Sequence, residues 1–112
     1  MPFPDKGVVL IDLNGRIAYA STYFCDAVGV GHNAIAGMSC FDFFFPEDTN
    51  VSRELLNLNH LAKGTPSRIR LRRKDGSTAW VNVQRVALQT AQGETYAISA
   101  TITAVDSERI TP

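Results

Sequence analysis

Residues 68–84 read RIRLRRKDGSTAWVNVQ and carry the clearest structural signal in the chain. Ile69 and Leu71 alternate with arginines, which is the period-two pattern of a strand with one buried face. Asp75-Gly76 then predicts a tight turn, because both residue types tolerate the backbone angles that such a turn requires. A second strand begins near Trp80, so the stretch predicts an antiparallel hairpin.

Strand patterns continue on both sides of this hairpin. The second strand runs on to Leu88, Gln92-Gly93 predicts another turn, and residues 94–105 form a third strand rich in Thr, Ile and Val. Near the N-terminus, Asn14-Gly15 separates two short strands, which is the strongest local signal for a β-hairpin. The sequence therefore predicts an N-terminal hairpin and a C-terminal three-stranded antiparallel meander.

Helical patterns fill the segment between these two β regions. Residues 23–28 have the apolar spacing of a short helix, which Ser21 or Thr22 is expected to cap and Gly29 to end. A longer helix is expected from Pro46 to Lys63, with apolar side chains repeating along one face. Strands separated by a helical insert favour an α+β domain, in which helices cover one face of an antiparallel sheet.

The composition is that of one ordinary globular domain. The chain has 112 residues, is 45% hydrophobic and carries no formal net charge. A neutral chain lacks the basic surface of most nucleic-acid-binding proteins, so Arg68, Arg70 and Arg72 are expected on a solvated strand face. With neither a signal peptide nor an apolar run of the roughly 20 residues that a membrane span needs, a cytoplasmic location without direct membrane contact is expected.

The residue patterns do not indicate catalysis or metal binding. Cys25 and Cys40 have neither CxxC nor zinc-site spacing, and the sequence lacks the common nucleophile, phosphate-loop and metalloprotease motifs. Glu47, Asp48 and Glu54 cluster at the expected start of the longer helix, where they suit the positive end of its dipole. The sequence therefore favours a protein that is not an enzyme.

The order of these landmarks resembles the PAS sensory domain family. Residues 12–17 (DLNGRI) are similar to the family's first turn, and Phe45-Pro46-Glu47-Asp48 is similar to its His-Pro-Glu-Asp helix start, with Phe45 in place of the histidine. Residues 70–77, followed by Trp80-Val81, resemble the family's most recognisable stretch. The resemblance implies a five-stranded antiparallel sheet, in strand order 2-1-5-4-3, with short helices packed on one face.

The resemblance also implies how the chain is divided. The PAS-like domain is expected at residues 7–106, after an N-terminal lead at 1–6 and before an exit segment at 107–112. Such domains serve as input modules of larger signalling proteins, here expected to be bacterial. A missing output domain, such as a histidine kinase or a cyclic-dinucleotide enzyme, is then implied. The signal is expected to leave through Val105, Asp106 and Ser107.

The resemblance implies a space between helices and sheet that holds either a small ligand or a packed core. An apolar pocket with few polar groups suits a small hydrophobic or aromatic ligand. The residues expected to line it are Phe24, Phe41, Phe44, Leu55, Leu58, Ile69 and Leu71, with Ser99 and Thr101 as polar anchors. The alternative is that the phenylalanine rings simply fill the core.

Flavin and haem occur in the family, although no cofactor is expected here. Cys40 stands where flavin photosensors carry their reactive cysteine, but Leu71 and Val81 stand where those proteins carry flavin-binding asparagines. His60 lies on the expected long helix, where haem-binding members carry an axial histidine, yet the matching position falls nearer Arg53. Both cofactors stay open as alternatives.

The outer face of the sheet is the second candidate site. In the family this face commonly packs on a second copy or on a flanking helix, and exposed apolar patches commonly mark protein interfaces. The residues expected there are Trp80, Tyr96, Ile98 and Ile102. The resemblance therefore implies a homodimer formed through the sheet face or the N-terminal segment. A purely structural dimerisation module with a filled core and no ligand is the alternative function.

Overall fold

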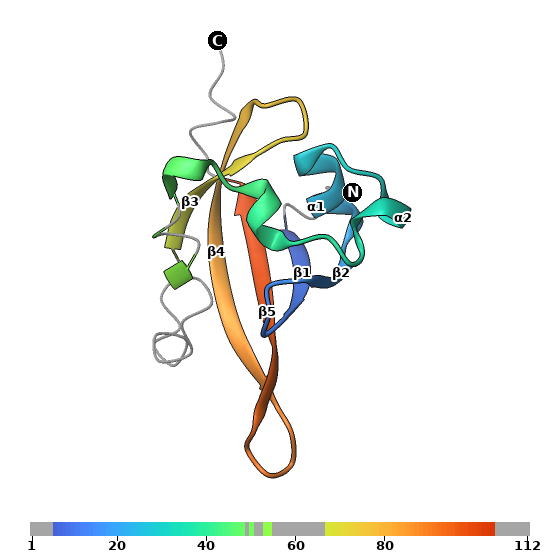
Figure 1. Cartoon of the computed structure of the whole chain (residues 1–112), viewed down its shortest axis with the longest axis vertical. Coiled ribbons are helices and arrows are strands. Elements are labelled where there is room, and N and C mark those ends of the chain that lie inside the picture. The colour runs from blue at the N-terminus through green and yellow to red at the C-terminus, as the bar shows by residue number, and fades with distance from the viewer. Residues whose placement is uncertain (1–5, 49, 51–52, 55–66, 105–112) are drawn as a thin grey trace.

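The computed structural model describes residues 6–48, 50, 53–54 and 67–104, which form one antiparallel sheet with short helices (Figure 1). The sheet has the order β2-β1-β5-β4-β3, which confirms the expected topology. Its strands are β1 (Lys6–Asp12), β2 (Ile17–Ala20), β3 (Ser67–Arg72), β4 (Thr78–Gln89) and β5 (Thr95–Ala104). The β4–β5 hairpin extends well past the other strands in Figure 1.

The helical elements lie between β2 and β3 in the chain and cover one face of the sheet (Figure 1). They are α1 (Thr22–Val28), α2 (His32–Ile35), and the 3₁₀ helices η1 (Cys40–Phe43) and η2 (Pro46–Asp48). None of the helices in the described part of the chain is long and apolar enough to cross a membrane.

The short helix after β2 begins and ends where the sequence predicts. Gly29 ends α1 in the left-handed conformation, with φ of 77°, and its N–H donates to the carbonyl of Cys25. Ser21 occupies the N-cap position, but its hydroxyl does not cap the helix. The hydroxyl instead accepts a hydrogen bond of 2.9 Å from the N–H of Val8, so it joins the start of α1 to β1.

The longer helix predicted from Pro46 is only partly described. Pro46–Asp48 form a 3₁₀ turn, and Asn50, Arg53 and Glu54 are helical. The remaining positions of that helix, including Leu55, Leu58 and His60, lie outside the described residues, as do the exit residues Val105, Asp106 and Ser107.

The turn between β1 and β2 fixes the position of η1 within the helical segment that covers the sheet. Asp12 Oδ1 accepts hydrogen bonds of 2.9 Å from the N–H groups of Asn14 and Arg16. Gly15 has φ of 88°, and a Cβ there would lie 2.7 Å from the ring of Phe41. Its carbonyl accepts a 2.7 Å hydrogen bond from the N–H of Cys40. The close approach therefore places η1 directly over the end of the hairpin.

Side chains alternate between the two faces along most of the sheet, and the pairing register shifts between Leu10 and Ile11 and between Leu88 and Gln89. In β5, Ile98, Ala100 and Ile102 are buried against the helices, while Ser99 and Thr101 are only partly buried. The same period of two buries Ile69 and Leu71 in β3, as the sequence predicts. We call the helix-covered side the inner face and the opposite side the outer face.

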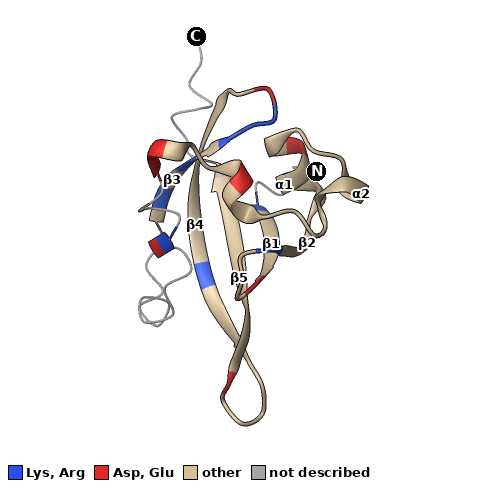
Figure 2. Cartoon of the chain, in the orientation of Figure 1, with Lys and Arg blue, Asp and Glu red and all other residues tan. Residues whose placement is uncertain are grey.

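Charged residues are distributed unevenly over this fold. Figure 2 shows them along β3, at turns, in the helical segment and on β4, whereas β5 carries none. One of them, Arg73, ties the β3–β4 turn to α1, because its Nε donates to the carbonyl of Ala27 at 3.1 Å and its Nη1 to that of Thr78 at 2.6 Å. The central strand β5 therefore carries no charge on either face, whereas its neighbour β4 carries Arg85.

Candidate functional site

A small apolar cavity lies between the inner face and the helices. Its volume is about 40 Å³, which is roughly the room of one water molecule. Nearly all of its walls are hydrocarbon, and its lining residues are Val9, Ile11, Phe24, Cys40, Phe43, Phe44, Ile69, Leu71, Val83, Arg85, Ile98, Ala100 and Ile102. The cavity is far smaller than the several hundred cubic ångströms of a typical ligand pocket.

The structure brings together four of the residues predicted to line this pocket, Phe24, Phe44, Ile69 and Leu71. Phe24 also packs edge-to-face on Phe43, with ring centroids 5.7 Å apart. Their contact with a ligand stays a prediction, and the predicted Leu55 and Leu58 lie outside the described residues.

The predicted position of Phe41 in the pocket was wrong. Phe41 is 37% exposed because its ring covers the Gly15 turn instead. It borders a separate open cleft of about 410 Å³, which Arg53 and Arg72 also line.

The predicted orientation of β5 was also wrong. Ser99 and Thr101 point to the outer face, so they cannot anchor a ligand in the cavity, whereas Ile98 and Ile102 were expected on the outer face and instead line the cavity. The physical reason is the larger apolar area of isoleucine, whose burial stabilises the fold more than burial of serine or threonine.

Arg85 of β4 is the charged residue among the pocket residues that the sequence analysis missed. It lies on the inner face, opposite Ala100 of β5 in the register. Its Nη1 donates to the backbone carbonyl of Glu54 at 3.0 Å, and its Nη2 contacts Ser67 Oγ at 3.5 Å. Burial lowers the pKa of the Arg85 guanidinium, and the charge of Glu54 opposes this effect. Val81, Val83 and Arg85 occupy alternate positions of β4, and this alternation is the sequence signal that predicts an inward side chain at Arg85.

Cys40 also lines the cavity, but its thiol is not prepared for reaction. Burial, followed by the negative charges of Asp12 and Asp42, raises the pKa of Cys40 to about 12. A reactive cysteine needs the opposite shift, since the thiolate is the nucleophile.

The described residues do not fit a flavin. Leu71 and Val81 are buried on the inner face and have no polar side-chain atoms for the edge of a flavin ring. The cavity is also far too small for such a ring.

The haem alternative depends on the expected long helix. His60 lies outside the described residues, and Arg53, the position nearest the family's axial histidine, is an exposed arginine. Among the residues that the structure describes, no group of three or more His, Cys, Asp or Glu side chains could hold a metal ion.

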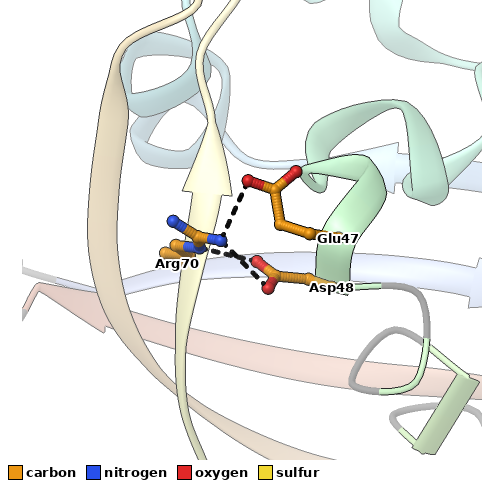
Figure 3. Close-up of polar contacts among 3 residues, drawn as sticks. All are labelled: Glu47, Asp48 and Arg70. Atoms are coloured by element: carbon orange, nitrogen blue, oxygen red, sulfur yellow. Dashed lines mark hydrogen bonds and ion pairs between the residues drawn. The ribbon is translucent and has the colours of Figure 1, made fainter.

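An ion-pair cluster joins the helical segment to the edge strand β3 (Figure 3). Arg70 Nε donates to Asp48 Oδ2 at 2.7 Å, and its Nη2 contacts Asp48 Oδ1 at 3.2 Å and Glu47 Oε2 at 3.4 Å. The guanidinium also lies over the ring of Phe45, 4.6 Å from its centroid. The hydrogen bond to Asp48 is the main cause of the raised pKa of Arg70. Glu47 and Asp48, which were expected to interact with the positive end of a helix dipole, thus bind Arg70.

The outer face carries a row of uncharged side chains across neighbouring strands. Leu10 pairs in register with Tyr19 of β2 and with Ser99 of β5, and Ser99 pairs with Val86 of β4. Tyr19 is 46% exposed and Val86 is 59% exposed. Hereafter these four residues are called the outer-face row.

Of the residues predicted for the outer face, Trp80 does lie there. It is 39% exposed, and the guanidinium of Arg68 sits 5.3 Å from the centroid of its ring. Tyr96 has the inward alternation of Ile98, and it is 57% exposed because the β4–β5 hairpin extends beyond the pairing with β1, which ends at Ala97. The predicted interface residues therefore do not form one patch.

Taken together, an antiparallel sheet with a helical insert over an apolar cavity defines a small α+β domain. The family model described as PAS domain matches residues 5–107. The chain therefore belongs to the PAS domain family, whose members are sensory or signalling input domains.

Solved structures share the fold at low sequence identity. The PAS domain of a protein from Colwellia psychrerythraea has a TM-score of 0.81 and 17% identity, covering 93% of this chain and 89% of that chain. The PAS-B domain of Drosophila melanogaster Cycle, with bound ethylene glycol, has a TM-score of 0.72 and 17% identity over 88% of this chain and 99% of that chain.

A third structure comes from a study of a flavin analogue in a light-oxygen-voltage domain. It has a TM-score of 0.71 and 24% identity, covering 93% of this chain and 80% of that chain. Likeness at these identities establishes the fold. The search of curated proteins gave no match.

Proposed function

We propose that this PAS domain is the input module of a larger signalling protein and that it self-associates through the outer face of its sheet. The observation that carries the proposal is the outer-face row, in which Tyr19 and Val86 are both largely exposed. Isolated apolar side chains are common on protein surfaces, but these are joined through Leu10 and Ser99 by direct strand pairing. An uncharged row that exposes the side chains of Tyr19 and Val86 has the partly apolar character of many interfaces.

A second copy of the chain is the partner that the charge distribution favours. The chain has no formal net charge, so two copies do not repel each other as whole molecules. The central strand β5 carries no charged residue, and a symmetric pair therefore brings no like charges together there (Figure 2). A two-fold interface needs such a self-complementary surface.

A second candidate function is binding of a small ligand in the inner-face cavity. Its support is the apolar lining of the cavity and the charged side chain of Arg85 at its wall. The competing explanation is a filled core, which the small volume of about 40 Å³ favours for any large ligand. Ligand occupancy would act by changing the packing of strands and helices. The change would leave at the end of β5, toward an output domain such as a histidine kinase or cyclic-dinucleotide enzyme of a bacterial cytoplasm.

Self-association is tested by sedimentation equilibrium of the wild-type chain over a wide concentration range. We expect a concentration-dependent dimer, and Val86→Glu should weaken it by about tenfold or more, because it places a charge in the outer-face row. Ala91→Glu is the matched control, since Ala91 is exposed in the turn between β4 and β5 and is not part of the outer-face row. A monomer at every concentration, or equal weakening by both variants, would contradict the proposal.

Ligand binding is separated from a filled core by mass spectrometry of the denatured protein after mild purification. A stoichiometric small molecule released on denaturation supports the ligand-binding function. A spectrum that contains the polypeptide alone, together with no response to added small molecules, supports the filled module.

A further inference from the structure

Another open cleft, with a volume of about 370 Å³, lies on the helical side of the domain. It opens between the β3–β4 turn, whose charges are visible in Figure 2, and the segment from the end of α1 to η1. Three consecutive basic residues, Arg72, Arg73 and Lys74, form one of its walls, so we call it the basic cleft. Asp42 is the one acidic residue of its described lining. The cleft therefore has a surplus of positive charge on a chain whose formal net charge is zero.

Hydrogen bonds to α1 and within the turn hold the basic wall in place. The N–H of Lys74 donates to the carbonyl of Val28, at the end of α1, at 2.8 Å. The guanidinium of Arg73 donates to the carbonyls of Ala27 at 3.1 Å and of Thr78 at 2.6 Å, so this side chain is committed to the fold. Because these contacts already order the turn, a binding partner loses less free energy to ordering it.

The two other basic side chains, Arg72 and Lys74, are exposed and available to a partner. Arg72 Nη2 donates to the carbonyl of Asp42 at 2.9 Å, which uses one of the five N–H donors of a guanidinium and holds it at the cleft. Within the described residues, the ammonium of Lys74 makes no ion pair. The carboxylate of the neighbouring Asp75 instead accepts the N–H and the hydroxyl of Ser77, at 2.9 and 2.6 Å.

The opposite wall of the basic cleft is apolar. Val30 and Met38 are half-buried and pack against the hydrophobic core, the ring of Phe43 is buried, and Ala34 of α2 is exposed. The volume lies within the range of about 300–1,000 Å³ that is typical of binding pockets, so one side chain of the size of leucine fits there. A cleft with one cationic and one apolar wall suits an acidic segment that carries an apolar anchor.

The charge pattern favours such a segment over a nucleic acid. Nucleic acids bind through many phosphate contacts, whereas in this cleft only Arg72 and Lys74 are available to make them. Pockets for small molecules enclose most of the ligand surface, whereas an open cleft leaves much of a small ligand in water. A peptide segment gains further contact beyond the cleft, because its backbone continues on both sides of the anchor.

We propose that the basic cleft binds an acidic segment of a partner protein. One apolar side chain of that segment lies against Val30 and Met38, and carboxylates on either side of it pair with Arg72 and Lys74. This surface is used neither in self-association through the outer face nor in ligand binding in the inner-face cavity. Its test is therefore independent of both proposed functions.

The test is an NMR titration of the chain, labelled with ¹³C at its methionine methyl groups, with an acetylated and amidated pentapeptide. The peptide has a central leucine with two glutamates on each side. Met1 and Met38 are the methionines of the chain, and Met38 lines the cleft. We expect a saturable shift of the Met38 methyl signal, with binding that weakens as salt is added, because exposed charge pairs are screened.

Two control peptides separate the anchor from the charges. The peptide with alanine in place of leucine should bind about tenfold more weakly, because it buries less apolar area. The peptide with lysines in place of the glutamates should leave the Met38 signal unchanged, because its charge has the same sign as that of the basic wall.

Paired substitutions locate the effect at the basic wall. Arg72→Gln combined with Lys74→Gln should weaken peptide binding by about tenfold, because two carboxylates lose their partners. Lys6→Gln combined with Arg68→Gln is the matched control and should leave binding unchanged. It removes the same charge from the outer face, where the two residues belong to one row of paired strand positions. Well-dispersed amide spectra of each variant show that it is folded.

An added carboxylate should also oppose binding. Ala34→Glu places one in the lining of the cleft and should weaken peptide binding several-fold, whereas Ala91→Glu adds the same charge to the exposed β4–β5 turn and should not. Equal effects of Ala34→Glu and Ala91→Glu would contradict the proposal, because they would indicate a general effect of net charge.

Three further results would overturn the proposal. The first is a Met38 signal that does not shift with the glutamate peptide up to about 10 mM, a concentration at which even weak docking is detectable. The second is binding that is the same with leucine or alanine at the centre, since that would show charge attraction without a seated anchor. The third is tighter binding of a single-stranded oligothymidylate at the same signal, since that would assign the cleft to nucleic acid instead.

Discussion

At the scale of single residues, burial decides what the side chains of this domain can do. Cys40 and Arg85 line the same cavity and respond in opposite directions, since burial raises the pKa of the thiol and lowers that of the guanidinium. In both cases the neutral form is favoured where water is excluded. Cys40 is thereby kept protonated, which makes it a small apolar part of the wall.

The shifted pKa of Cys40 predicts a loss of stability in alkali. The thiol has a pKa of 9.0 in the unfolded chain and about 12 in the fold, so between these values only the unfolded state releases the proton. The stabilising contribution is therefore complete below pH 9 and is lost as pH rises toward 12. The limiting slope is about 1.4 kcal/mol per pH unit.

Urea unfolding of the wild-type chain and of Cys40→Ala, at several values from neutral pH upward, measures this contribution. The free-energy difference between the two proteins should shrink above pH 9, because the variant lacks the titrating group. Every other titratable side chain is present in both proteins, so its contribution cancels in the difference. A difference that stays constant with pH would show that the thiol pKa is not raised.

The residue scale is also where the sequence was least informative about the site. The alternation in residues 95–104 was evident, but the choice of buried face was wrong, since Ser99 and Thr101 were read as pocket residues. Comparing apolar areas would have placed Ile98 and Ile102 inside. The partners of Arg85 were not predictable from the sequence, because its contact at Glu54 lies 31 positions away.

At the scale of elements, the β regions were predictable because their signals are local. Asn14-Gly15, Asp75-Gly76 and Gln92-Gly93 each mark a turn that the structure contains between paired strands. The attachment of the helical segment was not predictable in the same way. Arg70 and Asp48 are separated by 22 positions, and no local pattern couples an arginine on a strand to a carboxylate in a 3₁₀ turn.

The cluster of Arg70, Asp48 and Glu47 is predicted to hold η2 against β3. Arg70→Met and Asp48→Asn should each destabilise the fold modestly, and the double variant should be little worse than either single one. This non-additivity follows because both substitutions remove the same interaction. The coupling should decrease at high salt, since the pair is partly exposed and therefore screened.

A double-mutant cycle in urea unfolding measures this coupling, with and without added salt. Arg68→Met combined with Asp48→Asn is the matched control, because Arg68 lies on the same strand but stacks on Trp80. That pair should be additive. Additivity for Arg70 and Asp48 as well would mean that the contact in Figure 3 does not stabilise the domain.

At the scale of the whole molecule, the two sites of the proposed function lie on opposite faces of the same strands. Arg85 lines the inner cavity and its neighbour Val86 belongs to the outer-face row, because successive residues of β4 point to opposite sides. Both are paired to β5, through Ala100 and Ser99 respectively. The β4–β5 hairpin therefore contributes residues to both sites, and its rigidity affects both.

That role predicts the order in which the sheet opens. β5 is hydrogen-bonded on both sides, to β1 over Asp12–Lys6 and to β4 over Val81–Gln89, whereas β2 and β3 are edge strands. Amide hydrogen exchange should accordingly be slowest at Ile98, Ala100 and Ile102, where opening requires most of the domain to unfold. Edge amides should exchange through smaller openings, with protection lower by about tenfold or more.

Exchange followed by NMR checks this order. Asp48→Asn provides an internal control, since loosening η2 should accelerate exchange of the β3 amides without affecting those of β5. Equal protection across the sheet would instead indicate that the strands open as one unit, leaving no local motion through which an event at either face could be passed to the other.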